Sequence, residues 1–294
     1  MEDVARTRRR LGDLEVFAIG FGAMTLTQVP GYDAARGVRV VHAALEAGIT
    51  LFDTADVYGP TNGYGVNETA LVEALRSWPG SLDDVVIATK GGHTRLEHDT
   101  WWIDGSAAHL RRACTDSLRR LGLDVLPLYQ HHRPDPRRPY AESMQALREL
   151  YDEGLVRRVG ISNASCDQIR EAAAILGEAL VSVQNELSPV APCAMDEIVL
   201  CQELGLAFLA WGPLGGMRSA KGLGATGPAR GFAEVAGARG VSPQRVALAW
   251  ELARSPVVIP IPGASRPESV RDSVAATELV LSAEELALLD QAVG

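Results

Sequence analysis

The sequence predicts an α/β fold, namely a (β/α)8 TIM barrel with an N-terminal β-hairpin and an extra C-terminal helix. Short apolar segments alternate along the chain with segments whose apolar residues recur at helical spacing. Short apolar strands separated by helices are typical of parallel strands that are buried on both faces. A β/α barrel commonly uses about 250 residues as one unit, so we expect residues 1–294 to form a single domain.

The individual elements follow from apolar runs, helical periodicity and turn residues. Residues 8–16 are predicted to form a hairpin that turns at Gly12-Asp13. Strands are expected at 17–21, 49–53, 84–90, 125–131, 156–161, 180–184, 206–211 and 257–261. Helices are expected at 36–46, 67–76, 106–121, 140–151, 166–176, 195–204, 243–253 and 283–292. A glycine-rich loop over 212–231 interrupts the alternation.

A doubly wound sheet is the alternative α/β architecture. Such a sheet usually carries a G-x-G-x-x-G segment after its first strand. The corresponding segment here is GFGAMT at 20–25, which lacks the third glycine. The barrel is therefore the favoured prediction.

The charge balance and the cysteines exclude several classes of function. The chain has 28 Lys+Arg against 37 Asp+Glu, a net charge of −9, which argues against a general nucleic-acid binder or a protein held on anionic lipid. The cysteines, which are Cys114, Cys166, Cys193 and Cys201, form no CxxC pair, so we expect neither a disulfide framework nor a metal site. The N-terminus has no signal-peptide pattern, and no run of about 18 apolar residues is present. A cytoplasmic protein, monomeric or homo-oligomeric, is expected.

Polar residues with catalytic chemistry follow three consecutive predicted strands. Asp53 and Tyr58 follow the strand 49–53, Lys90 ends the strand 84–90, and the pair His131-His132 ends the strand 125–131. In a barrel of this kind the active site lies at the carboxyl ends of the strands. We therefore expect these side chains to converge on one point.

The chemistry of these groups suits the protonation of a carbonyl oxygen while a hydride reaches the carbonyl carbon. A free tyrosine has a pKa of about 10, and an ammonium within about 4–6 Å lowers it. Lys90 is expected to supply that charge to Tyr58, while Asp53 keeps Lys90 charged and oriented. An imidazole is expected to donate a hydrogen bond to the substrate oxygen.

Several segments, in the same order over nearly the whole chain, resemble the aldo-keto reductase superfamily. They are LFDTADVYG (51–59), VVIATKGG (85–92), LYQHHRPDP (128–136), VRRVGISN (156–163), AWGPLGG (210–216) and IPIPGASRPESV (259–270). GFGAMTLT (20–27) and ATKGG resemble the bacterial pyridoxal-reductase-like and oxidoreductase branch. The resemblance implies an NADPH-linked barrel whose catalytic tetrad is Asp53, Tyr58, Lys90 and His132. His132 is preferred to His131 because the family's histidine precedes Arg-Pro-Asp.

The resemblance also implies a set of cofactor contacts. Ser162, Asn163 and Gln184 match positions that hold the nicotinamide carboxamide, and Trp211 matches the aromatic residue that stacks on the ring. Further expected contacts, near the pyrophosphate and at the adenosine 2′-phosphate, are Gly22, Pro213, Leu214, Gly216, Ser265, Arg266 and Arg271. NADPH is the expected cofactor. NADH stays possible because Asp272-Ser273 replaces the family's usual Glu-Asn pair.

Loop residues are expected to select the substrate. The candidate pocket walls are Met24, Tyr64, His93, Trp101 and Trp102. The leading hypothesis is an NADPH-dependent reduction of a small-molecule aldehyde or ketone with Tyr58 as the general acid. The alternatives are an NAD(P)-dependent sugar or alcohol dehydrogenase, and a cofactor-binding regulatory subunit like the potassium-channel β subunits of the superfamily. Neither nucleic acid nor a membrane is an expected partner.

Overall fold

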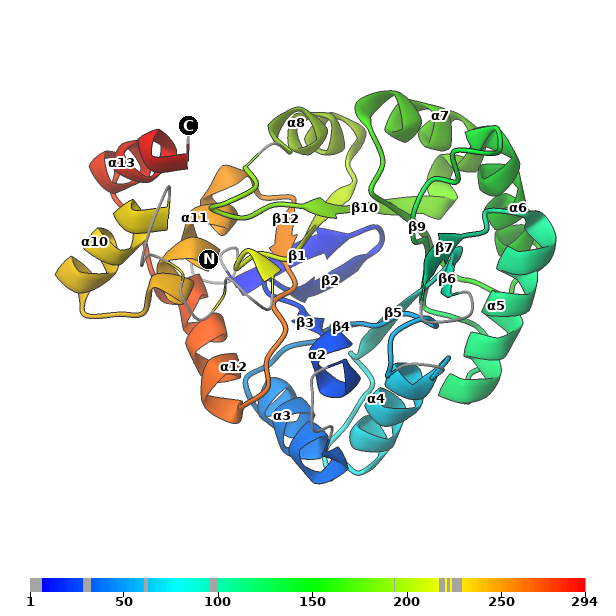
Figure 1. The fold of residues 1–294 in the computed structure, drawn as a ribbon, viewed down its shortest axis with the longest axis horizontal. Coiled ribbons are helices and arrows are strands. Elements are labelled where there is room, and N and C mark those ends of the chain that lie inside the picture. The colour runs from blue at the N-terminus through cyan, green and yellow to red at the C-terminus, as the bar shows by residue number, and fades with distance from the viewer. Residues whose placement is uncertain are drawn as a thin grey trace.

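Eight parallel strands of the computed structural model form one sheet in the order β3-β4-β5-β8-β9-β10-β11-β12 (Figure 1). The structure describes residues 7–28, 33–60, 63–95, 100–192, 194–216, 220, 223 and 229–293. The strands are β3 (Phe21–Gly22), β4 (Leu51–Asp53), β5 (Val86–Gly91), β8 (Leu128–His131), β9 (Val159–Ser162), β10 (Leu180–Glu186), β11 (Ala207–Trp211) and β12 (Val258–Pro260).

Backbone hydrogen bonds join the first strand of this sheet to the last. Gly20 N donates to Pro260 O at 2.9 Å, and Gly22 N donates to Pro262 O at 3.1 Å. The two edges of the sheet therefore lie side by side, which removes the exposed edges that an open sheet has. The predicted barrel is confirmed.

The predicted helices surround the sheet (Figure 1). They are α3 (Ala34–Glu46), α4 (Val66–Arg76), α5 (Ala107–Leu121), α6 (Tyr140–Asp152), α7 (Cys166–Leu176), α8 (Met195–Leu204), α11 (Pro243–Arg254) and the C-terminal α13 (Ala283–Val293). Side chains cap several of them. Asp33 accepts from two backbone N–H groups at the start of α3, and Ser165 forms a capping box with Gln168 at the start of α7.

The predicted strand over 17–21 is wrong in its extent. Phe17 ends β2 (Leu14–Phe17), which pairs with β1 (Arg8–Leu11) in the predicted hairpin, and β3 has only two residues. Ala18 N donates to Thr7 O, beside the hairpin, whereas Gly20 N bonds the last barrel strand. The segment changes partners along its length, so it forms no continuous ladder.

Other elements escaped the sequence analysis because they are short or polar. They are α2 (Met24–Thr27), β6 (His93–Arg95), β7 (Trp101–Ile103), η2 (Gly177–Ala179), α10 (Arg230–Arg239), α12 (Pro267–Val274) and η5 (Ala275–Glu278). β6 and β7 form an antiparallel hairpin in the long β5–α5 connection. Of the predicted loop over 212–231, residues 217–219, 221–222 and 224–228 lie outside the described residues, as does Cys193. Cys114, Cys166 and Cys201 are free thiols.

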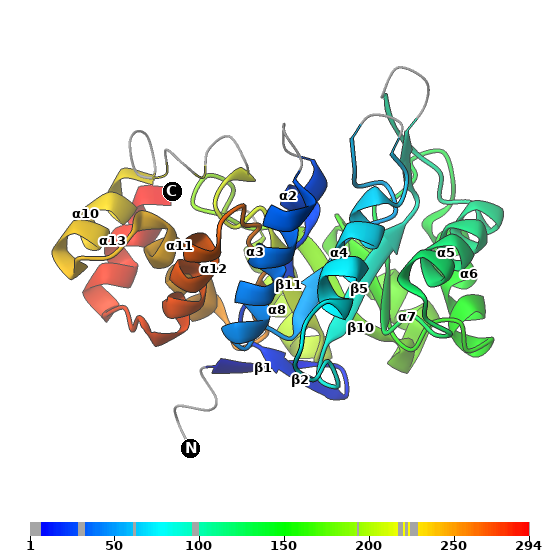
Figure 2. The ribbon, with the colours of Figure 1, turned by 90° about the horizontal axis from the view of Figure 1, so that it is seen from below.

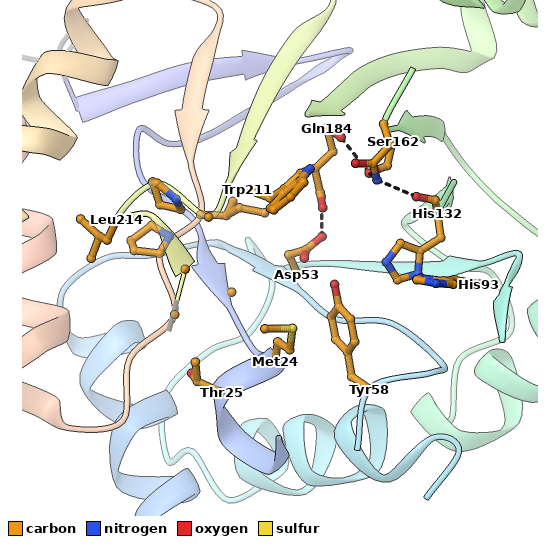
Figure 3. A pocket seen from close by; sticks show the side chains of 18 of the residues that line it. Met24, Thr25, Asp53, Tyr58, His93, His132, Ser162, Gln184, Trp211 and Leu214 are labelled. Atoms are coloured by element: carbon orange, nitrogen blue, oxygen red, sulfur yellow. Dashed lines mark hydrogen bonds between the residues drawn. The ribbon is translucent and has the colours of Figure 1, made fainter. Parts of the chain in front are cut away.

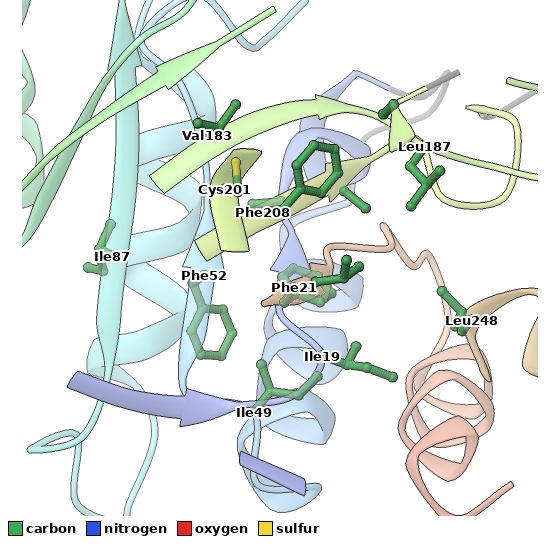
Figure 4. Close-up of a cluster of buried hydrophobic side chains, with 14 of the residues drawn as sticks. Ile19, Phe21, Ile49, Phe52, Ile87, Val183, Leu187, Cys201, Phe208 and Leu248 are labelled. Atoms are coloured by element: carbon green, nitrogen blue, oxygen red, sulfur yellow. The ribbon is translucent and has the colours of Figure 1, made fainter. Parts of the chain in front are cut away.

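Apolar side chains fill both sides of the sheet. Inside the barrel, buried residues of the strands such as Leu51, Leu128 and Ile259 pack together, and Leu11 and Val16 of the hairpin complete this cluster. The hairpin lies across one end of the barrel (Figure 2), so the opposite end is left for a site. A larger cluster fills the space between strands and helices (Figure 4). Each such large apolar side chain contributes about 1.5–3 kcal/mol on burial.

No helix among the described residues combines the length and the apolar composition that a bilayer-spanning helix needs. The cytoplasmic location and the single-domain organisation stay predictions.

Glu251 on α11 places a carboxyl group in the apolar core. Its side chain is fully buried, and neither carboxyl oxygen has a hydrogen-bond partner among the described residues. Burial alone raises the pKa of Glu251 well above its usual range, which favours the protonated form in the folded chain. A buried polar group without partners destabilises a fold by about 1–3 kcal/mol.

We expect Glu251→Leu to raise the midpoint of thermal unfolding by about 2–6 °C. In the unfolded chain a glutamate has a pKa of about 4.3, whereas in the folded protein the pKa of Glu251 is raised. The wild-type protein therefore loses stability as the pH rises from the unfolded towards the folded pKa, and the leucine variant does not. Calorimetry at pH 5 and pH 8 tests this: the gain should be larger at pH 8. A lower midpoint in the variant would contradict the account.

Candidate active site

A cavity of about 320 Å³ lies at the carboxyl ends of the strands. Asp53 at the end of β4, Ser162 at the end of β9, Gln184 on β10 and Trp211 at the end of β11 all line it. Figure 3 shows their side chains around one common space, with Tyr58 and His132 pointing into it. The strand ends therefore converge as the sequence predicts.

A buried ion pair lies directly behind this cavity. Lys90 Nζ is 2.6 Å from Asp53 Oδ2, and the two side chains are 0% and 4% exposed. Lys90 Nζ also donates to the backbone oxygen of Thr54 at 2.9 Å. Burial lowers the pKa of Lys90, but the nearby Asp53 and Tyr58 more than offset this, so its pKa is raised overall. Lys90 is held as an ammonium.

The other oxygen of Asp53 is held by two glutamine side chains. Gln184 Nε2 donates to Asp53 Oδ1 at 2.8 Å, and Gln130 Nε2 donates to the same atom at 3.0 Å. Gln130 lies directly opposite Lys90 in the β5–β8 ladder. Sequence analysis did not include it among the site residues, although it shares a strand face with His132. The carboxylate is therefore fixed by donors from three strands.

Tyr58 lies next to the ion pair and also lines the cavity. Lys90 Nζ is 5.0 Å from the centroid of the Tyr58 ring, and the Tyr58 and His132 rings meet edge to face at 5.6 Å and 83°. Burial raises the pKa of Tyr58, and the charge of Lys90 lowers it. Lys90 therefore acts in the predicted direction, but burial is the larger effect, and the net shift is upward.

Asn67, in the first turn of α4, holds the loop that carries Tyr58 in place through hydrogen bonds. Asn67 N donates to Tyr58 O at 3.2 Å, and Asn67 Nδ2 donates to Ala23 O at 2.8 Å. Thr54 Oγ1 donates to Asn67 Oδ1 at 2.7 Å. One fully buried amide thus connects the segment after β4 with the segment after β3.

Two further carboxyl groups are buried in and beside this loop, those of Asp56 and Glu68. Glu68 Oε2 pairs with Arg120 Nε at 2.6 Å, and Glu68 Oε1 accepts from Thr89 Oγ1 at 2.6 Å. Asp56 is buried, and burial followed by the charge of Glu68 raises its pKa well above the usual range. Glu68 is thus paired with Arg120, whereas the neighbouring Asp56 favours the protonated form.

The two adjacent histidines face different surroundings. His132 lines the cavity, and its ring meets that of His93 at 4.9 Å and 88°. His131 is not among the cavity residues, and its ring lies 5.8 Å from that of Tyr140. Burial, followed by the charge of Lys90, lowers the pKa of His132 well below its usual range. Burial lowers the pKa of His131 to about 4.

Most of the predicted cofactor residues line the cavity. These are Gly22, Ser162, Asn163, Gln184, Trp211, Pro213, Leu214 and Gly216. Ser265, Arg266 and Arg271 are not part of its lining. Ser265 and Arg266 are exposed just before α12, and Arg271 Nη2 lies 3.5 Å from Glu46 Oε2.

The cofactor side of the cavity has polar atoms and close backbone that a ligand can use. Ser162 Oγ donates to Gln184 O at 2.7 Å and accepts from Asn163 Nδ2 at 3.0 Å. Trp211 Nε1 is buried without a partner among the described residues. A Cβ on Gly22 would lie 2.6 Å from Ile261 O, so only glycine fits there.

The turn after β11 also depends on glycine. Gly212, Gly215 and Gly216 adopt φ angles of 64°, 75° and 80°, in the left-handed region that favours glycine. The turn thus lacks side chains at these three positions, while Pro213 and Leu214 between them line the cavity.

Three of the predicted pocket walls line the cavity, namely Met24, His93 and Trp101. The other two are not in its lining. The Tyr64 hydroxyl exchanges hydrogen bonds with the backbone of Arg95, and Trp102 lies beneath the guanidinium of Arg137, whose Cζ is 4.4 Å from the ring centroid.

Gly212, in the same turn as the expected contacts Pro213, Leu214 and Gly216, also lines the cavity. Sequence analysis missed other lining residues, which are Thr25, Arg133, Ala220, Ile261, Pro262 and Gly263. Most of them adjoin or lie within the quoted segments, and Arg133 directly follows His132. Ala220 has a methyl side chain within the predicted loop over 212–231, so its residue type gives no indication of a place in a binding site.

Comparisons with known proteins agree with this geometry. The sequence model of the Aldo/keto reductase family matches residues 18–293. The chain is 36% identical over 292 residues to pyridoxine 4-dehydrogenase of Escherichia coli (strain K12), covering 95% of this chain and 96% of the relative. A glycerol dehydrogenase structure from Gluconobacter oxydans has a TM-score of 0.84 at 27% identity, covering 98% of this chain and 95% of that chain. An aldo-keto reductase from Klebsiella pneumoniae in complex with NADPH has a TM-score of 0.78 at 30% identity, covering 97% and 94%.

The family model spans nearly the whole barrel, from the segment before β3 into α13. The resemblance carried by the sequence segments is thus confirmed, and the pyridoxine 4-dehydrogenase match agrees with the bacterial branch. The chain therefore belongs to the Aldo/keto reductase family, whose members are NAD(P)H-dependent oxidoreductases.

Proposed function

We propose that this protein reduces an aldehyde or a ketone to an alcohol with NADPH, and that Tyr58 is the general acid. One observation carries the proposal: the Tyr58 phenol and the His132 imidazole face one cavity, and the Lys90–Asp53 ion pair lies buried behind them. A phenol with a fixed ammonium beside it can release a proton and have the resulting charge stabilised. Among the described residues that line the cavity, no other group combines a proton with a buried counter-charge of this kind.

The residues along the cavity fit a nicotinamide cofactor. Ser162, Asn163 and Gln184 would hold the carboxamide, Trp211 would lie against the ring, and the turn from Gly212 to Gly216 would receive the pyrophosphate. The indole N–H of Trp211, which has no hydrogen-bond partner among the described residues, supports this fit. When bound, NADPH supplies the hydride.

The preference for NADPH rests on the loop before α12. Arg266 is exposed and has no ion pair among the described residues, whereas Arg271 pairs with Glu46. Arg266, with Ser265, is therefore the better candidate for the 2′-phosphate. One hydrogen bond to a charged group is worth roughly 1.5–3 kcal/mol, or about one to two decades of preference over NADH. NADH remains a usable second cofactor under this proposal.

The proton transfer follows from the environment of Tyr58. Because burial raises the pKa of Tyr58, the phenol keeps its proton at neutral pH and can donate it to a carbonyl oxygen. Lys90 then stabilises the phenolate. His132 stays neutral because burial and Lys90 lower its pKa, so its role is to donate an N–H hydrogen bond to the same oxygen.

Oxidation of an alcohol by the reverse path is the second candidate function. It is favoured by the similarity to a glycerol dehydrogenase structure. This direction needs the phenolate of Tyr58, which the raised pKa disfavours at neutral pH. We therefore assign reduction as the main direction at neutral pH. Alcohol oxidation is expected to become significant at alkaline pH.

Tyr58→Phe should retain NADPH binding and lose at least about 10²-fold in kcat for aldehyde reduction, which is the usual scale for a general acid. Initial rates at saturating NADPH and a fluorescence titration of NADPH measure the two effects. Tyr64→Phe is the matched control, because Tyr64 lies outside the cavity lining and should keep its turnover. If Tyr58→Phe turns over at a near-normal rate, the proposed mechanism is wrong.

The pH profile should differ between the two directions. For reduction, kcat should stay flat between about pH 6 and pH 9, because the pKa of His132 is lowered and that of Tyr58 is raised. For alcohol oxidation, kcat should rise with pH, by up to about tenfold per unit, as more phenolate forms. Steady-state rates with saturating cofactor measure both. An inflection near pH 6.5 in reduction would show that His132 titrates there and would contradict this assignment.

A further inference from the structure

The cavity contains an arginine that the proposed mechanism does not use. Arg133 follows His132, lines the cavity and is half-buried. Its Nη2 donates one hydrogen bond, to Asn163 Oδ1 at 3.3 Å. Among the described residues, no carboxylate oxygen lies within ion-pair distance of it.

Neighbouring arginines are neutralised, in contrast to Arg133. Arg137 Nε lies 3.0 Å from Asp135 Oδ1, and Arg138 Nε lies 3.8 Å from Asp135 Oδ2. Arg120 is paired with Glu68. Among the described residues of this loop, Arg133 thus lines the cavity and has no carboxylate counter-ion, whereas Arg137 and Arg138 do.

The charge of Arg133 lowers the pKa of both histidines that line the cavity, His93 and His132. Burial, followed by the charges of Arg133 and Arg95, lowers the pKa of His93 to about 4. Arg133 also contributes to the lowered pKa of His132. Both rings are therefore neutral at physiological pH, and each retains one N–H that can donate a hydrogen bond.

His93 extends the polar part of the wall next to Arg133. Its ring lies 4.9 Å from that of His132 and 4.7 Å from that of Trp101. The remaining walls on this side, Met24 and Trp101, are apolar or aromatic. Among the described residues, this side of the cavity thus has an apolar surface, two neutral imidazoles and one guanidinium. In a protein with a net charge of −9, an anionic substrate depends on such a local cation.

We infer that the site takes aldehydes or ketones that carry a carboxylate, with Arg133 pairing with that carboxylate and His93 donating a second hydrogen bond to it. This inference rests on the proposed carbonyl reductase function and specifies its substrate class. A guanidinium pairs well with a planar carboxylate because its N–H groups match the two oxygens. Arg133 is a specificity-determining residue in this account, since it contacts the substrate away from the reacting carbonyl.

The test compares two aldehydes of similar shape and different charge, 4-carboxybenzaldehyde and 4-nitrobenzaldehyde. The ratio of their kcat/KM values is measured for the wild-type protein, Arg133→Gln and Arg133→Lys. We expect Arg133→Gln to lower the preference for 4-carboxybenzaldehyde by about 10- to 100-fold, which is the effect of losing one hydrogen bond to a charged group. Arg133→Lys should retain most of this preference. Arg137→Gln is the matched control, because Arg137 is paired with Asp135 and lies outside the cavity lining.

Two outcomes would overturn the inference. One is an unchanged ratio in Arg133→Gln. The other is an equal loss for both aldehydes together with weaker NADPH binding, which would mean that Arg133 acts through Asn163 on the cofactor.

A binding experiment separates this inference from the proposed function. Benzoate is titrated into the protein with NADP+, with tryptophan fluorescence as the readout, since Trp101 and Trp211 line the cavity. The dissociation constant should rise about 10-fold or more in Arg133→Gln. If neither aldehyde is reduced but this loss is observed, the anion site stands and the proposed function fails. If reduction is observed and benzoate binds both proteins equally, the function stands and the inference fails.

Discussion

The Lys90–Asp53 ion pair is the interaction on which the rest of the site depends. A fully buried ammonium is strongly unfavourable unless a carboxylate and hydrogen-bond acceptors surround it. Here Asp53 lies 2.6 Å away, and Thr54 O accepts a second bond. Asp53 in turn needs its other oxygen satisfied, and Gln130 and Gln184 supply those donors. Four strands of the barrel, β4, β5, β8 and β10, are therefore joined in one polar network next to the cavity.

Two opposing effects set the state of Tyr58, and their relative size decides its role. Burial outweighs the charge of Lys90, so the pKa of Tyr58 is raised in the protein alone. A general acid for reduction must hold its proton before the reaction and tolerate its loss afterwards. The raised pKa meets the first requirement, and the adjacent ammonium meets the second. Burial thus keeps the proton on Tyr58 before the reaction, and Lys90 stabilises the phenolate after the proton has been transferred.

Sequence periodicity predicted the barrel because parallel buried strands leave a strong signal, as in the runs that end at Asp53 and Lys90. The same rule that brings strand ends together predicted the convergence of Asp53, Tyr58, Lys90 and His132. The hairpin of β6 and β7 was missed because its strands have three residues each, too few for a pattern. Gln130 and Arg133 were missed because their importance comes from their surroundings: Gln130 donates to Asp53 across the barrel, and Arg133 has no counter-ion among the described residues.

The central claim is that the charge of Asp53 keeps Lys90 an ammonium beside Tyr58. The most direct test is the pH profile of kcat for aldehyde reduction by Asp53→Asn. Without the carboxylate, burial is left to lower the pKa of Lys90, so the variant should lose activity as the pH rises through that lowered value. We predict a kcat that is reduced by at least about tenfold and falls further towards alkaline pH. A near wild-type kcat with a flat profile over the same range would contradict the account.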